Sequence, residues 1–283
     1  MRNKSSFLLI AITALFMTGC GGVKTKKIND IADLKDKVIG AISLSPDTKG
    51  MEAMISGYVG SFKEAIFYNR TSDEVAAVLA GKVDACVGPN LTMDYYAKRN
   101  PNLKVIAINE RVEGSVFMAV RSEDGKLKAE LDSAITILHG NGILKTLEEK
   151  WITNLPAYNE PTHTDIPKIP GAKTVYVGVA GDFPPLDYMA ADGRPAGYNV
   201  ATLTEMGKVV NINFEFVSIE TQARFAALSG KKIDVIFCNF ENKDHEAFTV
   251  ALRNNSWLST KPYCNYLGGY FLVKGELAIK NRY

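Results

Sequence analysis

The sequence predicts an α/β protein of two similar lobes, each built on a mostly parallel sheet. Apolar strand-like runs alternate with amphipathic helical segments along most of the chain. A helix–turn–strand unit occurs twice, at Leu79–Ala85 and at Leu228–Val235, with one extra residue in the second copy. The length of 283 residues favours about two domains, and 46% hydrophobic residues supply ample core material.

The first nineteen residues are expected to be a signal peptide. Arg2 and Lys4 precede an apolar run over residues 7–17 that is too short to span a bilayer stably. The tetrapeptide ending in Cys20 resembles a bacterial lipobox, which implies a lipid-anchored mature chain; an ordinary signal peptide with a chance cysteine is the alternative. Residues 20–27, rich in Gly and Lys, are expected to form a tether.

Charge and cysteine content exclude several function classes. The net charge is +2 and the chain has no basic run, so nucleic acid is not an expected partner. Cys86, Cys238 and Cys264 form no metal-binding pattern, and no metal or cofactor is expected. Cys86 and Cys238 lie in apolar runs and are expected to be buried thiols. A disulfide between them stays open as an alternative, because an exported protein permits one.

The elements follow in order. Residues 28–114 predict a helical turn, strands and short helices, with strands over residues 38–43, 62–68, 83–87 and 103–108 and helices over 72–80 and 95–99. A strand over 115–120 and two amphipathic helices, over 127–138 and 143–151, come next. Residues 152–173 carry four prolines and predict an extended linker. Residues 174–268 then predict a second run of strands and helices, at 175–179, 202–209, 213–217, 221–228 and 233–237.

One stretch carries a family resemblance. Val175–Tyr188 contains a strand that ends in Gly-Asp-Phe-Pro-Pro, and Gly193 and Gly197 follow in a hairpin. This stretch resembles the opening of a mature extracellular solute-binding protein of family 3, the polar-amino-acid binders that feed ABC transporters. The paired helices ending in Lys150-Trp151 resemble the C-terminal end of the same family. Residues 262–274 resemble its first crossing between lobes, and residues 33–37 resemble the segment that follows that crossing.

The resemblance implies the two-lobed periplasmic-binding-protein type 2 fold in a circularly permuted order. Lobe 2 would comprise residues 28–114, completed by 269–283. Lobe 1 would comprise residues 174–268 and the closing helices within 115–151. Residues 152–173 would join the two positions that are the chain termini in the unpermuted family. Permutation is physically plausible where termini lie close together on a surface. Two truncated half-domains, each needing a partner, are the alternative.

The resemblance also implies a ligand site between the lobes. Phe183 matches the family's stacking aromatic residue, and Asp182 precedes it; a core position for Phe183 and a turn-capping role for Asp182 are the alternatives. Tyr188 is a weaker candidate, for which packing in the hairpin is the more natural role. Arg253 has the family's spacing for the arginine that binds the ligand carboxylate, although it also suits a surface loop.

In lobe 2 the family supplies an anion-binding turn and an acidic partner for an ammonium group. The matching positions hold Leu44 and Ser45, with Thr48 following, and Pro89, with Asn90 following. The acidic group is therefore missing at its usual place, which puts a standard amino acid in doubt unless Asp182 or Glu241 takes that role.

The resemblance implies a monomeric solute-binding lipoprotein on the outer face of a bacterial membrane. It would deliver a small polar solute, an amino acid or a related compound, to an ABC transporter permease, and it would have no catalytic residues. Two alternatives stay open: an enzyme resembling cyclohexadienyl dehydratases, with an acid–base pair drawn from Asp182, Glu241 and His245, and a ligand-sensing module without transport.

Overall fold

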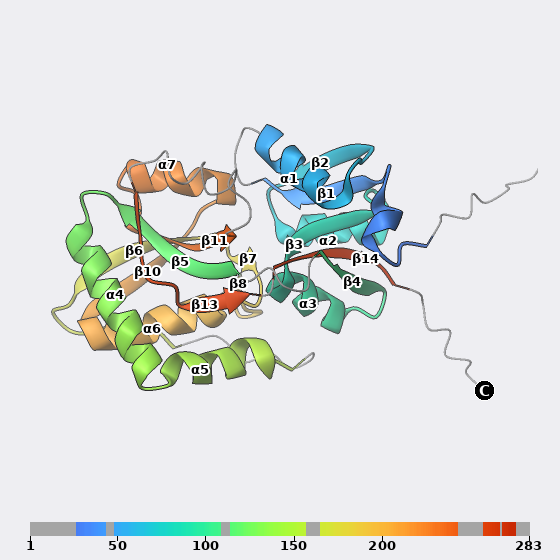
Figure 1. Cartoon of the computed structure of the whole chain (residues 1–283). Helices are drawn as coiled ribbons and strands as arrows, with labels where there is room; N and C mark the ends of the chain where they lie inside the picture. The colour runs from blue at the N-terminus through green and yellow to red at the C-terminus, as the bar shows by residue number, and fades with distance from the viewer. Residues whose placement is uncertain are drawn as a thin grey trace, which may run out of the picture.

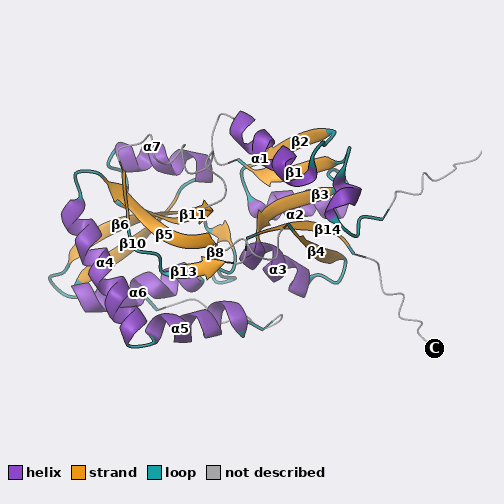
Figure 2. Ribbon diagram, viewed as in Figure 1, coloured by secondary structure: helices purple, strands orange, loops and turns teal. Residues whose placement is uncertain are grey.

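Two α/β lobes lie beside one another, each on its own sheet, as the sequence predicts (Figure 1). The structure is a computed structural model that describes residues 27–43, 48–108, 114–156, 165–242, 257–266 and 268–275. Strands and helices alternate within both lobes (Figure 2). The predicted α/β fold class, with two lobes, is confirmed.

Lobe 2 holds five strands and the helices between them. The strands are β1 (Val38–Ile42), β2 (Glu64–Tyr68), β3 (Ala85–Pro89), β4 (Leu103–Ala107) and β14 (Gly269–Lys274). The helices are the short η1 (Ile31–Leu34), α1 (Lys49–Val59), α2 (Thr71–Ala80) and α3 (Asn90–Arg99).

The lobe 2 sheet has the strand order β2-β1-β3-β14-β4. β1 runs parallel to β2 and β3, whereas β14 runs antiparallel to both β3 and β4. Alternate residues of β14 face opposite sides of this sheet. Phe271 and Val273 belong to the core under α1, and Leu272 belongs to the core under α2 and α3. The sheet is therefore covered on both faces, with β14 as an internal strand (Figure 1).

Lobe 1 holds the second sheet. Its main strands are β5 (Gly114–Arg121), β6 (Lys173–Val179), β10 (Ile212–Ser218), β11 (Val235–Asn242), β12 (Trp257–Ser259) and β13 (Cys264–Tyr266). A small sheet adds β7 (Asp182–Phe183), β8 (Asp187–Met189) and β9 (Pro195–Ala196). The helical elements are α4 (Gly125–Gly140), α5 (Ile143–Glu148), the π-helix η2 (Glu149–Thr153), α6 (Tyr198–Val210), η3 (Thr221–Ala223) and α7 (Arg224–Ser229).

The lobe 1 sheet has the order β10-β6-β11-β5-β12, and β13 also pairs with β5. Its large core lies under α4, α5 and α6, where Trp151 and Tyr198 are fully buried. A smaller core under α7, on the other side of the sheet, contains Leu228 and Ile233. The two sheets share one plan: three parallel strands, in chain order 2-1-3, are followed by an antiparallel strand that arrives from the other lobe.

This shared plan explains the repeated sequence unit. In lobe 2 the unit joins α2 to β3, and in lobe 1 it joins α7 to β11. Gly81 ends α2 in the left-handed conformation, with a φ of 74°. In the longer copy Gly230 has a φ of −79°, and Lys231 takes the positive φ instead, at 57°. The extra residue therefore moves the left-handed turn by one position without changing the strand that follows.

The cysteines settle one further expectation. Cys86 and Cys264 are buried free thiols, so Cys86 forms no disulfide with Cys238, and the alternative pairing is wrong. Burial raises the pKa of Cys86 well above its ordinary value, and it raises the pKa of Cys264 to about 12. Within the described residues, no helix is long and apolar enough to cross a membrane.

Candidate functional site between the lobes

A cavity of about 110 Å³ lies between the two lobes. Its lining residues come from both sides: Asn69, Arg70 and Thr71 from lobe 2, and Ala180, Asp182, Phe183, Ser218, Glu220 and Thr221 from lobe 1. Most of them follow the carboxyl ends of β2, β6 and β10. Ligands of open α/β sheets bind at this end of the strands. Because one ordered water needs roughly 10–15 Å³, the cavity has room for a small solute.

Asp182 is the centre of the contacts between the lobes. Its Oδ2 atom accepts hydrogen bonds from the backbone amide and from the hydroxyl of Ser72, each at 3.0 Å. The Nε atom of Arg70 lies 3.6 Å from the same oxygen. Ser72 is in the first turn of α2, where backbone amides have no partner within the helix and the helix dipole favours an anion. The carboxylate of lobe 1 therefore sits at a helix N-terminus of lobe 2.

Phe183 lies at the wall of this cavity and against the core of lobe 1 at the same time. Its side chain is half-buried. The short β7–β8 hairpin positions it, with Asp182 opposite Tyr188 and Phe183 opposite Asp187. One part of the Phe183 side chain therefore packs against the core, and another part lines the cavity.

Two more contacts join the lobes. The side-chain amide of Gln222 donates a hydrogen bond of 3.0 Å to Oδ1 of Asn69. The rings of Tyr95, on α3, and Tyr188, on β8, lie 6.2 Å apart between centroids. Tyr188 is 8% exposed, so its body serves packing at the lobe boundary, the role that the hairpin pattern favours.

Other sequence-predicted residues lie away from the cavity lining. Asn90 is buried at the start of α3, and its backbone amide donates to the carbonyl of Gly268 at the crossing between lobes. Thr48 precedes α1, and its hydroxyl donates to Glu52. Neither belongs to the residues that line the cavity. Cys20, Ser45, His245 and Arg253 lie outside the described residues, as does the side chain of Glu241.

The sequence interpretation missed Asn69, Arg70 and Ser72 in lobe 2, and Glu220 and Gln222 in lobe 1. A usable signal was present. Residues 69–72 come directly after a predicted strand and start a predicted helix, and residues 218–222 do the same in the other lobe. Loops in this position are the usual ligand-binding loops of α/β sheets.

Helix α2, whose first residue Thr71 lines the cavity, also carries a buried acid. Glu74, in the first turn of α2, is 0% exposed, and its carboxylate oxygens have no hydrogen-bond partner within the described part of the chain. Desolvation raises its pKa well above the ordinary value, and the backbone of Val87 opposes that shift. Burial also raises the pKa of Tyr96, and the charges of Asp182 and Glu74 raise it further. Tyr96 therefore lies within electrostatic range of both Asp182 and Glu74.

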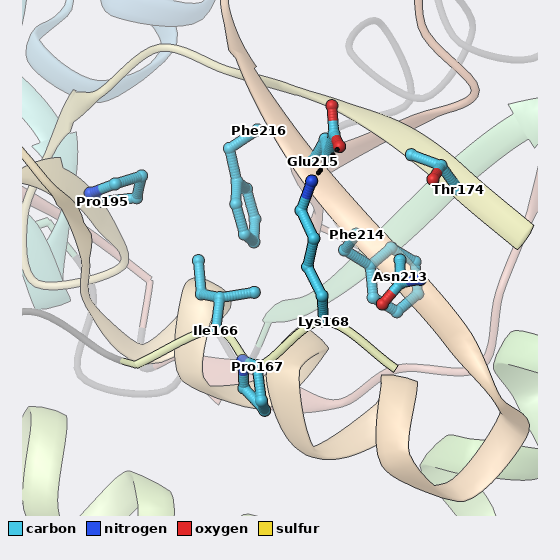
Figure 3. Close-up of a pocket in the computed structure, with 9 residues that line it drawn as sticks. All are labelled: Ile166, Pro167, Lys168, Thr174, Pro195, Asn213, Phe214, Glu215 and Phe216. Atoms are coloured by element: carbon cyan, nitrogen blue, oxygen red, sulfur yellow. Dashed lines mark ion pairs between the residues drawn. The ribbon is translucent and has the colours of Figure 1, made fainter. Parts of the chain in front are cut away.

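A larger cavity, of about 410 Å³, lies on the outer edge of lobe 1. Strand β10 and residues 166–168 line it, and Lys168 reaches across to Glu215, 3.6 Å away (Figure 3). Its walls come from one lobe, so closure of the lobes cannot act on it. Among the described residues, no group of three His, Cys, Asp or Glu side chains is placed to hold a metal ion.

Two family models match the chain. Residues 175–276 match the bacterial extracellular solute-binding proteins of family 3, and residues 8–120 match the family described as NMT1/THI5 like.

Curated relatives include three bacterial binding proteins. They are L-cystine-binding protein TcyJ of Bacillus subtilis, 34% identical over 37% of this chain and 37% of that protein; amino-acid-binding protein AabA of Dichelobacter nodosus, 30% identical over 49% and 53%; and a probable amino-acid ABC transporter-binding protein of Haemophilus influenzae, 28% identical over 38% and 39%. The chain spans about half or less of the length of these relatives.

Solved structures that match this chain at low sequence identity include two ligand-binding proteins. The ligand-binding component of an ABC-type import system from Staphylococcus aureus has a TM-score of 0.44 at 11% identity, over 85% of this chain and 66% of that one. The GluR0 ligand-binding core has a TM-score of 0.40 at 12% identity, over 84% of both chains. On the sequence matches, residues 175–276 of this chain are similar to the bacterial extracellular solute-binding proteins of family 3.

Proposed function

We propose that this chain is a solute-binding protein of an ABC importer and binds a small polar solute between its lobes. The observation that carries the proposal is the cavity at the carboxyl ends of strands from both sheets. It offers an apolar ring at Phe183, charged groups at Arg70, Asp182 and Glu220, and hydroxyl groups at Thr71, Ser218 and Thr221. Small-solute sites combine an apolar face with a few placed polar groups in this way.

The solute class is an amino acid or a related compound. The curated relatives are named as amino-acid-binding and L-cystine-binding proteins, which supports this class. In this proposal Asp182 and Phe183 contact the ligand, Tyr188 supports the hairpin that carries them, and Arg253 is a further ligand-binding residue, as the family resemblance implies. The chain does no covalent chemistry, and its partner is a permease that recognises the ligand-bound arrangement of the lobes.

The resemblance of Cys20 to a lipidated cysteine supports export and anchoring to a membrane through lipid. In cells, Cys20→Ser should move the protein from the membrane fraction to the released fraction while solute binding persists. Membrane retention of the Cys20→Ser protein would contradict the anchor.

A thermal-shift screen tests the binding function. The screen uses the common L-amino acids, L-cystine, small amines and nucleosides, followed by calorimetry on each solute that stabilises the protein. A saturating ligand at about a hundred times its Kd should stabilise the folded protein by about 2.7 kcal/mol. No stabilisation by any of these solutes would overturn the proposal for this solute class.

A further inference from the structure

We propose that Arg70 and Ser72 form the anion-binding half of the interlobe cavity, and that Asp182 occupies it until an anionic group of the ligand replaces it. The inference rests on the proposed function, because it treats the cavity as the solute site. The family resemblance places the carboxylate partner in lobe 1, at Arg253. The contacts around Asp182 point instead to lobe 2.

The first step is the donor set. An amide, a hydroxyl and a guanidinium converge on one carboxylate oxygen, at 3.0, 3.0 and 3.6 Å. All three donors belong to Arg70 and Ser72, at the start of the ten-residue helix α2. A set of N–H and O–H donors with a cation suits a carboxylate, and here it already holds one. Its fit to that chemical group is therefore visible in the structure.

The second step is that Asp182 can be exchanged. Asp182 belongs to the other lobe, so its contact with Ser72 holds only while the two lobes lie against each other. The Arg70 side chain is 62% exposed and reaches Asp182 through Nε. Within the described part of the chain, its side chain makes no other ion pair or hydrogen bond. A ligand carboxylate that meets both Nη atoms would exchange one long contact for two short ones.

The third step is charge balance. Among the described residues that line the cavity, Arg70 is the one cation, and Asp182 and Glu220 are the acids. Once an anionic group of the ligand replaces Asp182 at Ser72, the carboxylates of Asp182 and Glu220 both remain on the lobe 1 side of the cavity. These two carboxylates can then pair with an ammonium group of the ligand. The cavity thus selects a small solute with its anionic group toward lobe 2 and its cationic group toward lobe 1.

Acetate, the smallest stable alkyl carboxylate, tests this assignment without knowledge of the ligand. Titration with potassium acetate, against potassium chloride at equal ionic strength, is followed at the Ser72 amide by ¹H–¹⁵N NMR. Asp182→Ala vacates the donor set and should bind acetate with a Kd at least tenfold lower than the unmodified protein. The double variant Asp182→Ala/Arg70→Gln should lose that gain. Asp182→Asn, which removes the charge but keeps the shape, serves if the alanine variant does not fold.

Glu220→Gln is the matched control, because it removes a carboxylate from the same cavity without touching Ser72. Three results would overturn the inference. They are an equal rise in acetate affinity in Glu220→Gln, a rise that persists in Asp182→Ala/Arg70→Gln, and no rise in either single Asp182 variant. The result is separable from the proposed function. If the Asp182 variant gains acetate affinity but no solute stabilises the protein, the anion site is supported and the proposed function is contradicted. If a solute stabilises the protein but the acetate affinity does not rise, the proposed function is supported and the anion site is contradicted.

Discussion

Asp182 of lobe 1 and Ser72 of lobe 2 are 110 residues apart in the sequence and are joined by two hydrogen bonds of 3.0 Å. The Asn69–Gln222 hydrogen bond also joins lobe 2 to lobe 1. The loops that carry these four residues also line the cavity, so the contacts between the lobes and the walls of the site are built from the same segments. Any change in the separation of the lobes must therefore act on the cavity directly.

Removing the Ser72 hydroxyl and the Gln222 side-chain amide, each of which donates one hydrogen bond across the lobe boundary, should open the lobes. The double variant Ser72→Ala/Gln222→Ala should have a larger radius of gyration by small-angle scattering, because rigid lobes joined by hinges separate when their contacts are lost. The free energy of unfolding should fall by no more than about 1–3 kcal/mol, the range expected for two partly exposed hydrogen bonds. Ser56→Ala, which removes an exposed serine hydroxyl bonded within its own lobe, is the control. An unchanged radius of gyration in the double variant would show that other contacts set the lobe separation.

Phe183 should contribute to ligand binding more than to folding. Phe183→Ala should raise the Kd of any solute found in the screen at least tenfold, because the ring forms a wall of the cavity. Since the side chain is half-buried, the free energy of unfolding should fall by about 2 kcal/mol, less than for a fully buried ring. Phe183→Leu keeps an apolar side chain without the flat ring, so its Kd should lie between those of the unmodified protein and Phe183→Ala. Calorimetry at equal concentrations of folded protein measures the Kd of the unmodified protein and of both variants. An unchanged Kd in Phe183→Ala would contradict a role of Phe183 in ligand binding.

Glu74 should make stability depend on pH. Its folded pKa is raised above the ordinary value of 4.5 by burial. Between the unfolded and the folded pKa the folded chain binds more protons, so the free energy of unfolding decreases as pH rises, by up to about 1.4 kcal/mol per pH unit. Glu74→Gln removes the titrating group and should flatten this slope above about pH 5. Urea unfolding at several pH values measures the slope.

Asp94 is the control for that series, because partial burial raises its pKa as well while Lys98 opposes the shift. Asp94→Asn should remove a smaller part of the slope than Glu74→Gln. If Glu74→Gln leaves the pH dependence as it was, Glu74 is charged in the folded protein and has a partner of its own.

Arg121 should be a major contributor to the stability of lobe 1. It is 7% exposed, pairs with Asp124 and Asp234 at 2.6 Å each, and donates to the carbonyls of Leu228 and Ile233. Arg121→Met should lower the free energy of unfolding by about 3 kcal/mol, the lower end for breaking a buried pair, because both carboxylates keep some solvent contact. Arg194→Met, at an exposed pair with Asp192, should cost less than about 1 kcal/mol. Chemical denaturation measures the free energy of unfolding of both variants. Equal losses would show that burial of the Arg121 ion pairs does not increase their contribution to stability.

The order of the elements is proposed to be a circular permutation. The amide of Gly275 donates to the carbonyl of Asn102, and Lys104 donates to the side chain of Asn29, so both ends of the described chain lie beside β4. A rearranged gene that joins residue 275 to residue 28 through a Gly/Ser linker, and starts within residues 157–164, should give a folded protein. Its melting temperature should lie within several degrees of the original, measured by circular dichroism, and it should bind the same solutes. A rearranged chain that stays unfolded would contradict the proposal.

The sequence predicted more of the fold than of the site. Strands such as Val175–Val179 and helices such as Leu127–Leu138 follow from local apolar periodicity, and the repeated unit at Gly81 and Gly230 placed two similar lobes. Asp182 and Phe183 were found through the family resemblance, and both line the cavity.

The missed residues depend on contacts between distant segments. Ser72 and Arg70 acquire their importance only when Asp182, more than a hundred residues later, approaches them. Glu74 has the pattern of a solvated acid in the first turn of a helix, which is favourable electrostatically. Packing of α2 against the lobe 2 sheet buries it instead, and no local pattern reports that.

Strand β14 lies between β3 and β4, although it is translated more than 160 residues after them. While the chain emerges from its N-terminus, β3 and β4 must wait for β14, with their facing edges open to pairing with other chains. Lobe 1, whose strands are all made before β14, can complete its sheet first. Folding is therefore expected to be vectorial, with lobe 2 finishing only when the final strand emerges, and the long sequence separation of its strand pairs makes that step slow.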